Sequence, residues 1–289
     1  DRSGVGVHSG TYDLSIVNNH FGTVGDQPID FEGSGSEADA IDGVVIDNNV
    51  IDYMPGSQGE MSVEIQMTRN LVFRNNRVAG RGLFVFGCVH CKFLHNVVTK
   101  SAPGSEIAVL EMDKANQDVV VDDNTFERKA EAGPGYVVRV QPFGTGLPIG
   151  VSFSSNNFTL HTTGTLLETM GLVGLTVSNN IFFYDGPSGT GVVSSYGMVL
   201  NGSAGASPVR TTDLHILDNA LRGPLKFGVG VSSSYGGTGT LDVRRNVMTG
   251  LVGPGLFCSN ITLGNQVLGP ITTHANAWTP VSCGPPGFV

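Results

Sequence analysis

The pattern that decides the fold stands in FRNNRV at residues 73–78 and again in FLHNVV at residues 93–98. Both segments read apolar–x–x–Asn–x–apolar. Internal repetition with a period of about 20–50 residues is the signature of a solenoid or a related repeat architecture. Seven further segments share the pattern, and LGNQV, centred on Asn265, is a weaker copy: IVNNHF (16–21), IDNNVI (46–51), VDDNTF (121–126), FSSNNF (153–158), VSNNIF (177–182), ILDNAL (216–221) and VRRNVM (243–248).

The shared asparagine predicts a tight turn in every coil. Asparagine adopts the left-handed backbone conformation more readily than other non-glycine residues, so we expect it to make the bend between two strands by itself. Coils stacked one strand spacing apart, about 4.8 Å, allow the side-chain amides to hydrogen-bond in a ladder. The predicted ladder consists of Asn19, Asn49, Asn76, Asn96, Asn124, Asn156, Asn180, Asn219 and Asn246.

The nine segments resemble the parallel β-helix repeats of the pectate-lyase-like superfamily, over nearly the whole chain. The resemblance implies an all-β, right-handed parallel β-helix with three strands per coil and ligands in the groove beside the first strand. We expect one domain of about ten coils over residues 1–289, with residues 266–289 as a C-terminal cap or tail. The fold says little about activity, and the sequence lacks the Asn-Thr-Asp and Gly-His-Gly motifs of polygalacturonases and the Arg-x-x-Pro-x-x-Arg motif of pectate lyases.

The charge balance is acidic, which limits the partners. The 289 residues include 16 Lys and Arg against 25 Asp and Glu, for a formal net charge of −9. Binding to nucleic acid needs clustered basic charge, so we do not expect it. No apolar run reaches the about 20 residues that span a bilayer, so we expect no membrane insertion. The chain begins at Asp1 within an apparent strand-and-turn unit, and we expect a secreted or cell-surface protein.

Four cysteines allow more than one interpretation. Cys88 and Cys91 form a C-x-x-C that, with His90 and His95, nominally supplies the four ligands of zinc. Neighbouring residues of a strand point in opposite directions, which disfavours that site, and we predict no metal centre. A disulfide between Cys258 and Cys283 is more plausible in a secreted protein, and buried free thiols are a comparable alternative.

The first strand of each coil can be located upstream of each asparagine turn. Alternation along a strand places apolar residues inside and their neighbours outside. Nine inward residues are aligned on this basis: Val7, Phe31, Ile65, Val85, Leu110, Val140, Leu167, Leu200 and Val231. They lie in the segments 4–8, 28–32, 63–67, 83–87, 108–112, 137–141, 166–170, 198–201 and 227–232.

The outward positions of these strands form an acidic strip with two phenylalanines. We predict that the groove binds a polysaccharide or oligosaccharide and cleaves it by carboxyl acid–base hydrolysis, which needs a proton donor and a second carboxylate. The candidate catalytic residues are Glu111, Glu168, Arg139 and Glu64. The candidate substrate-binding residues are Phe84, Phe86, Gln66, Gln141, Glu32 and Asn201, with the phenylalanine rings as platforms for a sugar face.

Two other functions remain open. A polysaccharide lyase acting on uronates needs a cation beside the uronate carboxylate and a base, for which Arg139 serves as base or clamp while Glu64 and Glu111 hold calcium. A non-catalytic carbohydrate-binding or structural surface module, as in phage tailspikes, needs no chemistry at all. Then Glu111, Arg139 and Glu168 form a surface charge ladder of little energetic value, and a loop such as 53–60 covers the phenylalanines.

Overall fold

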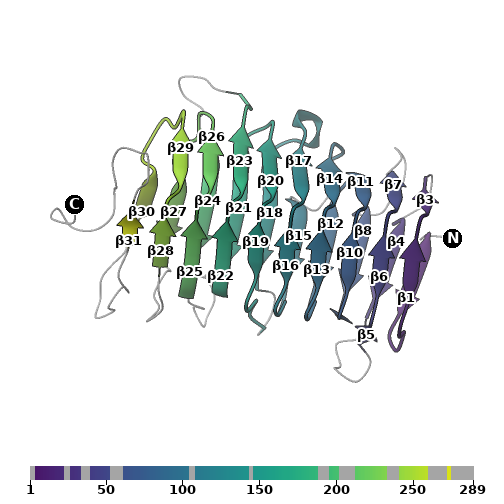
Figure 1. Ribbon diagram of the computed structural model, residues 1–289. Coiled ribbons are helices and arrows are strands. Elements are labelled where there is room, and N and C mark those ends of the chain that lie inside the picture. The colour runs from purple at the N-terminus through teal and green to yellow at the C-terminus, as the bar shows by residue number, and fades with distance from the viewer. Residues whose placement is uncertain are drawn as a thin grey trace.

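The chain forms a solenoid of parallel strands, as a computed structural model shows for residues 4–22, 27–33, 40–52, 61–103, 108–142, 146–187, 195–201, 212–232, 241–259 and 272–274. Successive coils lie side by side along one axis, from the purple N-terminal coil to the yellow C-terminal strands (Figure 1). The strands form three long parallel sheets, here sheets A, B and C, and a two-stranded sheet of β5 (Ile41–Asp42) and β9 (Thr68–Arg69). The all-β parallel β-helix predicted from the sequence is therefore confirmed.

Sheet A contains the first strand of each coil. Its ten strands, in spatial order, are β1 (Val5–His8), β4 (Ile29–Glu32), β8 (Val63–Gln66), β12 (Leu83–Phe86), β15 (Ala108–Asp113), β18 (Gly135–Gln141), β21 (Gly164–Met170), β24 (Tyr196–Asn201), β27 (Val229–Ser232) and β30 (Leu256–Ser259). The nine predicted first strands all lie in this sheet, and β30 is an additional strand that the sequence analysis missed.

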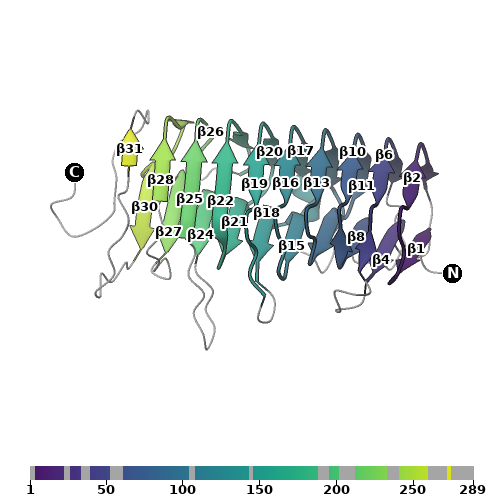
Figure 2. The same cartoon turned by 60° about the horizontal axis from the view of Figure 1, so that its bottom comes forward.

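Sheets B and C complete each coil, and sheet B lies beside sheet A in the rotated view (Figure 2). Sheet B contains β2 (Ser15–Val17), β6 (Val45–Asp47), β10 (Val72–Arg74), β13 (Lys92–Leu94), β16 (Val120–Asp122), β19 (Ser152–Ser154), β22 (Val173–Ser178), β25 (Thr212–Leu217), β28 (Leu241–Arg244) and β31 (Thr272–His274). Sheet C contains β3 (His20–Phe21), β7 (Val50–Asp52), β11 (Arg77–Gly80), β14 (Val97–Lys100), β17 (Thr125–Arg128), β20 (Asn157–Leu160), β23 (Ile181–Tyr184), β26 (Ala220–Arg222) and β29 (Val247–Thr249). The only helical element among the described residues is the short 3₁₀ turn η2 (Ala130–Ala132).

Columns of apolar side chains fill the interior because alternate residues of every short strand point inward. In sheet C, Phe126, Phe158 and Phe182 stack on consecutive coils, with ring centroids 5.6 and 4.7 Å apart. All three are buried. Such columns bury the apolar face that a single coil cannot bury alone, so each coil depends on its neighbours for stability.

The asparagine ladder is confirmed, with one correction to its backbone geometry. Each amide from Asn19 to Asn219 donates to the amide oxygen of the next ladder asparagine, across distances of 2.8–3.2 Å. The left-handed residue is the one before the ladder asparagine, such as Asn75 (φ 54°) or Asp123 (φ 51°). The preceding residue makes the bend and thereby turns the ladder asparagine inward. The weaker copy at Asn265 lies outside the described residues.

The predicted register is wrong on two strands of sheet A. Met112, rather than Leu110, pairs with Val85 and Val140. Thr169, rather than Leu167, pairs with Val140 and Leu200. The alternation itself is correct, because Leu110 and Leu167 also point inward, but the shift by two residues moves Glu111 and Glu168 into a different outward row.

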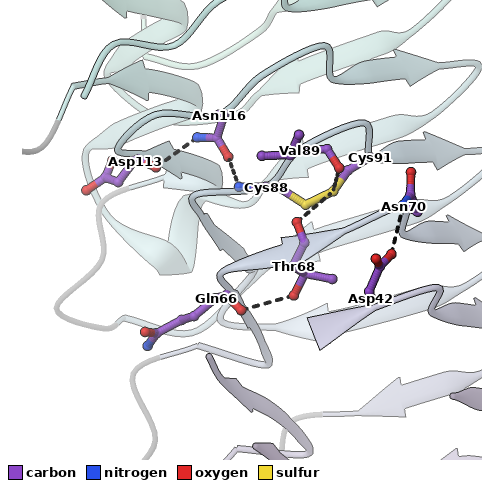
Figure 3. The surroundings of a disulfide bond; sticks show 9 residues. All are labelled: Asp42, Gln66, Thr68, Asn70, Cys88, Val89, Cys91, Asp113 and Asn116. Atoms are coloured by element: carbon purple, nitrogen blue, oxygen red, sulfur yellow. Dashed lines mark hydrogen bonds between the residues drawn. A yellow bond between two sulfur atoms is a disulfide. The ribbon is translucent and has the colours of Figure 1, made fainter. Parts of the chain in front are cut away.

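The interpretation of Cys88 and Cys91 as free thiols needs correction, because a disulfide joins them (Figure 3). It lies in the turn between β12 and β13, with Cα atoms 6.0 Å apart. Two cysteines bonded to each other supply no thiolates for zinc. His90 and His95 instead lie 3.4 and 2.9 Å from the carboxylates of Asp118 and Asp123 on the next coil. Cys283 and the side chain of Cys258 lie outside the described structure.

The C-terminal cap predicted for residues 266–289 also falls mostly outside the described residues. The described part, β31, pairs in parallel with β28 and continues sheet B. The cap stays a prediction.

Candidate functional site

The outer face of sheet A carries two rows of polar and aromatic side chains, which together we call the acidic strip. The first row is Asp30, Glu64, Phe84, Glu111, Arg139 and Glu168, on strands β4 to β21. The second row is Glu32, Gln66, Phe86, Asp113, Gln141, Met170 and Asn201, on strands β4 to β24. Because the strands are parallel and in register, neighbours within a row are one strand spacing apart, about 4.8 Å.

An arginine between two glutamates forms the centre of the strip. Arg139 Nη1 lies 3.4 Å from Glu111 Oε1, and Arg139 Nε lies 3.2 Å from Glu168 Oε2. The Glu111 and Glu168 side chains are only 2% and 8% exposed, although both lie on the outer face of the sheet. This group is therefore a shielded ion triad, unlike a solvent-exposed charge ladder. Losing the arginine of such a triad leaves two buried carboxylates uncompensated.

Amide side chains extend the triad. Gln141 Nε2 lies 3.3 Å from Glu111 Oε1 and 3.1 Å from Asp113 Oδ2. Asn201 Nδ2 lies 3.5 Å from Glu168 Oε1. The amide donors thus link the two rows and fix the orientation of the carboxylates between them.

Glu168 is a largely buried carboxyl group beside a cation and a phenol. Burial raises its pKa above the usual range, and this effect outweighs the opposing influence of Arg139 and of the hydrogen bond from Tyr136. Burial and the charge of Glu168 likewise raise the pKa of Tyr136. A carboxyl group that is protonated more readily than usual is suited to general-acid catalysis near neutral pH.

Glu64 forms a second carboxylate site nearer the N-terminus. Gln27 and Gln66 each donate a side-chain hydrogen bond to one of its two oxygens. Phe84 and Phe86 lie between this site and the triad, half-buried and with ring centroids 6.0 Å apart. The strip thus has acidic groups on both sides of an aromatic pair.

The structure brings most of the candidates together but leaves one apart. Glu111, Glu168, Arg139, Gln141 and Asn201 form one connected group, and Glu64 with Gln66 forms another. Glu32 lies at the end of its row, is 61% exposed and pairs with His8 at 3.4 Å. It contacts neither group through any interaction seen in the described part of the chain.

The sequence analysis did not select three further members of the site, Asp113, Tyr136 and Lys114. Lys114 Nζ lies 4.9 Å from the centre of the Phe86 ring. A signal for Asp113 was present, because the alternation in AVLEMD (108–113) continues past Met112 and places Asp113 outward beside Glu111. Tyr136 lies within β18, but the two consecutive buried residues Val137 and Val138 interrupt the alternation there, and Lys114 follows the end of β15. Alternation therefore gives no direction for either side chain.

No metal site is evident in the described part of the chain: no three or more His, Cys, Asp or Glu side chains gather as ligands there. Glu64 and Glu111, which hold calcium in the lyase alternative, form no such cluster with a third ligand among the described residues. Likewise, no described helix is long and apolar enough to span a bilayer.

Fold and site define a parallel β-helix protein with a shielded acidic strip along its first sheet. Its fold is similar to that of the A-module of the mannuronan C-5 epimerase AlgE4 from Azotobacter vinelandii, with a TM-score of 0.63 and 15% identity over 92% of this chain and 69% of that one. A looser similarity, with a TM-score of 0.41 and 12% identity over 94% of this chain and 62% of the other, relates it to the catalytic unit of a GH87 α-1,3-glucanase from Streptomyces thermodiastaticus. No protein-family model and no curated protein sequence matches the chain.

Proposed function

We propose that the protein binds a polysaccharide along the acidic strip and hydrolyses it, with Glu168 as the proton donor and Glu111 as the partner carboxylate. The observation that carries the proposal is the in-register row Glu111, Arg139 and Glu168, in which a carboxyl group with a raised pKa lies two strands from a second carboxylate. Two strand spacings, about 10 Å between backbones, allow side chains to approach the about 6.5–9.5 Å carboxyl separation of inverting hydrolases.

The charge distribution favours a predominantly neutral glycan over a uronate. A lyase needs a cation that is available to the uronate carboxylate. Arg139 already interacts with Glu111 and Glu168, and its side chain is only 18% exposed. An anionic chain would also meet Asp30, Glu64 and Asp113 along the strip. The similarity in fold to a mannuronan epimerase makes glycans the first ligand class to test. It does not indicate which reaction the protein catalyses.

The disulfide supports the expectation of a secreted or cell-surface protein. Cys88 and Cys91 are both buried. Disulfides persist in oxidising compartments and are uncommon in the reducing cytosol. We therefore propose that the protein works outside the cytosol, where polysaccharides are accessible. Detecting the protein in the culture medium or on the cell surface of its source would test this assignment.

Incubation with a panel of neutral and uronic-acid polysaccharides tests the proposed reaction. We expect new reducing ends from a neutral glycan, without the ultraviolet absorbance of an unsaturated uronate. Substituting Glu168→Gln should lower kcat at least about 100-fold, because general acid catalysis contributes about 10²–10⁴-fold. Glu32→Gln is the matched control and should retain the wild-type rate, since Glu32 is exposed and apart from the triad.

The same panel separates the remaining possibilities. Unsaturated products from a uronate would replace the hydrolase by a lyase. Binding without any cleavage would leave a carbohydrate-binding module. Full activity of the Glu168→Gln variant would show that the proton donor is misassigned.

A further inference from the structure

A cationic side chain lies over each of three aromatic rings at the outer side of sheet A, but the described part of the chain places none over the Phe84 ring. Lys114 Nζ lies 4.9 Å from the Phe86 centroid, Arg139 Cζ lies 5.2 Å from the Tyr136 centroid, and Lys226 Nζ lies 5.7 Å from the Tyr196 centroid. No described cation lies over Phe84, whose ring contact is with Phe86. A cation over a ring face is an attractive interaction that occupies the surface a sugar would stack on.

The backbone holds Lys114 over Phe86. Lys114 (φ 66°) and Met67 (φ 48°) both adopt the left-handed conformation, which is uncommon for such side chains and often marks a functional site. Lys114 follows Asp113, Met67 follows Gln66, and Gly87 follows Phe86. Because Gln66, Phe86 and Asp113 pair in register, Gly87 lies between Met67 and Lys114. A Cβ atom at Gly87 would lie 2.7 Å from Met67 Sδ, so the methionine packs directly over this glycine. Lys114 Nζ lies 3.5 Å from that sulfur, which places the ammonium group at the edge of the strip.

The disulfide turn ties this arrangement to the next coil. Cys88 directly follows Gly87, and its backbone N–H donates to Asn116 Oδ1 at 2.9 Å. Asn116 Nδ2 in turn donates to the Asp113 carbonyl at 2.8 Å (Figure 3). The segment after Phe86 and the segment that carries Lys114 are therefore held together by a buried amide. Lys114 is kept near Phe86 by the covalent and hydrogen-bonded structure on both coils.

We infer that Phe84 is the sugar-stacking platform of the acidic strip, and that Lys114 closes Phe86 to the ligand. The inference rests on the proposed polysaccharide binding. Phe84 pairs in register with Glu64 on one side and Glu111 on the other. A pyranose stacked on Phe84 has hydroxyl groups directed toward both carboxylates, and the second sugar beyond it along the solenoid axis lies over Arg139, two strands away, and approaches Glu168. The ligand class is a neutral glycan of at least three sugar units whose rings present an apolar C–H face.

The test measures binding in a Glu168→Gln background, so that the glycan stays intact. Cellohexaose, xylohexaose and laminarihexaose serve as probes in titration calorimetry and proton NMR. Phe84→Leu keeps apolar bulk but removes the flat ring, and we expect it to weaken binding of the preferred probe at least tenfold. It should also abolish the upfield ring-current shift of the sugar C–H protons. Phe84→Trp should restore both, and Phe86→Leu should change the affinity less than threefold.

Each outcome decides the inference. Wild-type affinity and ring-current shift in Phe84→Leu overturn it, and so does an equal loss in Phe84→Leu and Phe86→Leu. Binding that depends on Phe84 in a protein without hydrolytic activity supports the platform and overturns only the proposed reaction. Absence of binding to every probe and every polysaccharide of the panel overturns both. Thermal melting of each variant shows whether a loss reflects unfolding.

Discussion

The asparagine ladder and the acidic strip are both columns of polar side chains stacked one strand apart, but they are built in opposite ways. The ladder repeats one neutral residue, and each amide donates to the next one along the column. The strip combines unlike residues, and its central carboxylates lie on either side of the single guanidinium of Arg139. A neutral column can extend without accumulating charge, whereas an acidic column needs a cation or protonation to remain buried. The ladder therefore serves architecture, whereas the strip keeps ionisable groups on the outer face of sheet A.

Breaking the ladder should have the largest effect on stability. Asn124 Oδ1 accepts from the backbone N–H and the side-chain amide of Asn96, and its Nδ2 donates to the carbonyls of Phe93 and Asp122 and to Asn156 Oδ1. Substituting Asn124→Ala leaves several buried groups unpaired, each at about 1–3 kcal/mol. We expect a loss of about 4 kcal/mol in the free energy of unfolding, measured by urea denaturation.

Asn157 gives the matched control for the ladder. It is exposed at the start of strand β20 and directly follows Asn156, the ladder partner of Asn124. Asn157→Ala should change the free energy of unfolding by less than about 0.5 kcal/mol. If both variants lose the same stability, the ladder contributes no more than ordinary surface asparagines.

Removing the guanidinium group of Arg139 from the acidic strip should have the next largest effect on stability. Arg139→Met leaves Glu111 and Glu168 facing each other without the guanidinium, and we expect a loss of about 3 kcal/mol at neutral pH. Lowering the pH should recover part of this loss, because protonation removes the uncompensated charge. Arg74→Met is the control, since the Arg74–Asp47 pair also joins adjacent coils but at an exposed site, where an ion pair contributes at most about 1 kcal/mol. Equal losses in the two variants would show that the triad behaves as a surface ion pair.

The same contrast explains how far the sequence predicts the structure. The ladder was predictable because one residue recurs in one apolar frame, and alternation then placed Glu111, Arg139 and Glu168 outward. The register of β21 was missed because Thr169 is polar, although it precedes Asn180 by the same interval as Ile65 precedes Asn76 and Val85 precedes Asn96. The contacts of Lys114 and Tyr136 depend on turn geometry and on residues of neighbouring coils. The residue pattern of a single strand does not predict such contacts.

Thr169 gives a smaller prediction, in the apolar column beneath the strip. Its side chain is fully buried between Val140 and Leu200, and its hydroxyl has no hydrogen-bond partner among the described residues. Thr169→Val keeps the shape and removes the unsatisfied group, so we expect a gain of about 1 kcal/mol in the free energy of unfolding. Thr159→Val, on the outer face of sheet C, should change it by less than about 0.5 kcal/mol. A loss of stability in Thr169→Val would show that the hydroxyl is satisfied in solution.

The smallest expected effect on stability comes from the ionisation of the buried Glu168 carboxyl group. Because burial raises its pKa in the folded state, the folded protein binds this proton more tightly than the unfolded chain does. The contribution of Glu168 to stability therefore falls as the pH rises from the unfolded pKa through the raised folded pKa. Glu168→Gln removes the titration, so its Tm should exceed that of the wild type at pH 8 by no more than about 3 °C, and the difference should narrow toward pH 4. A variant that is less stable than the wild type at pH 8 would mean that ionised Glu168 stabilises the triad, and the residue would then belong with the ladder as part of the architecture.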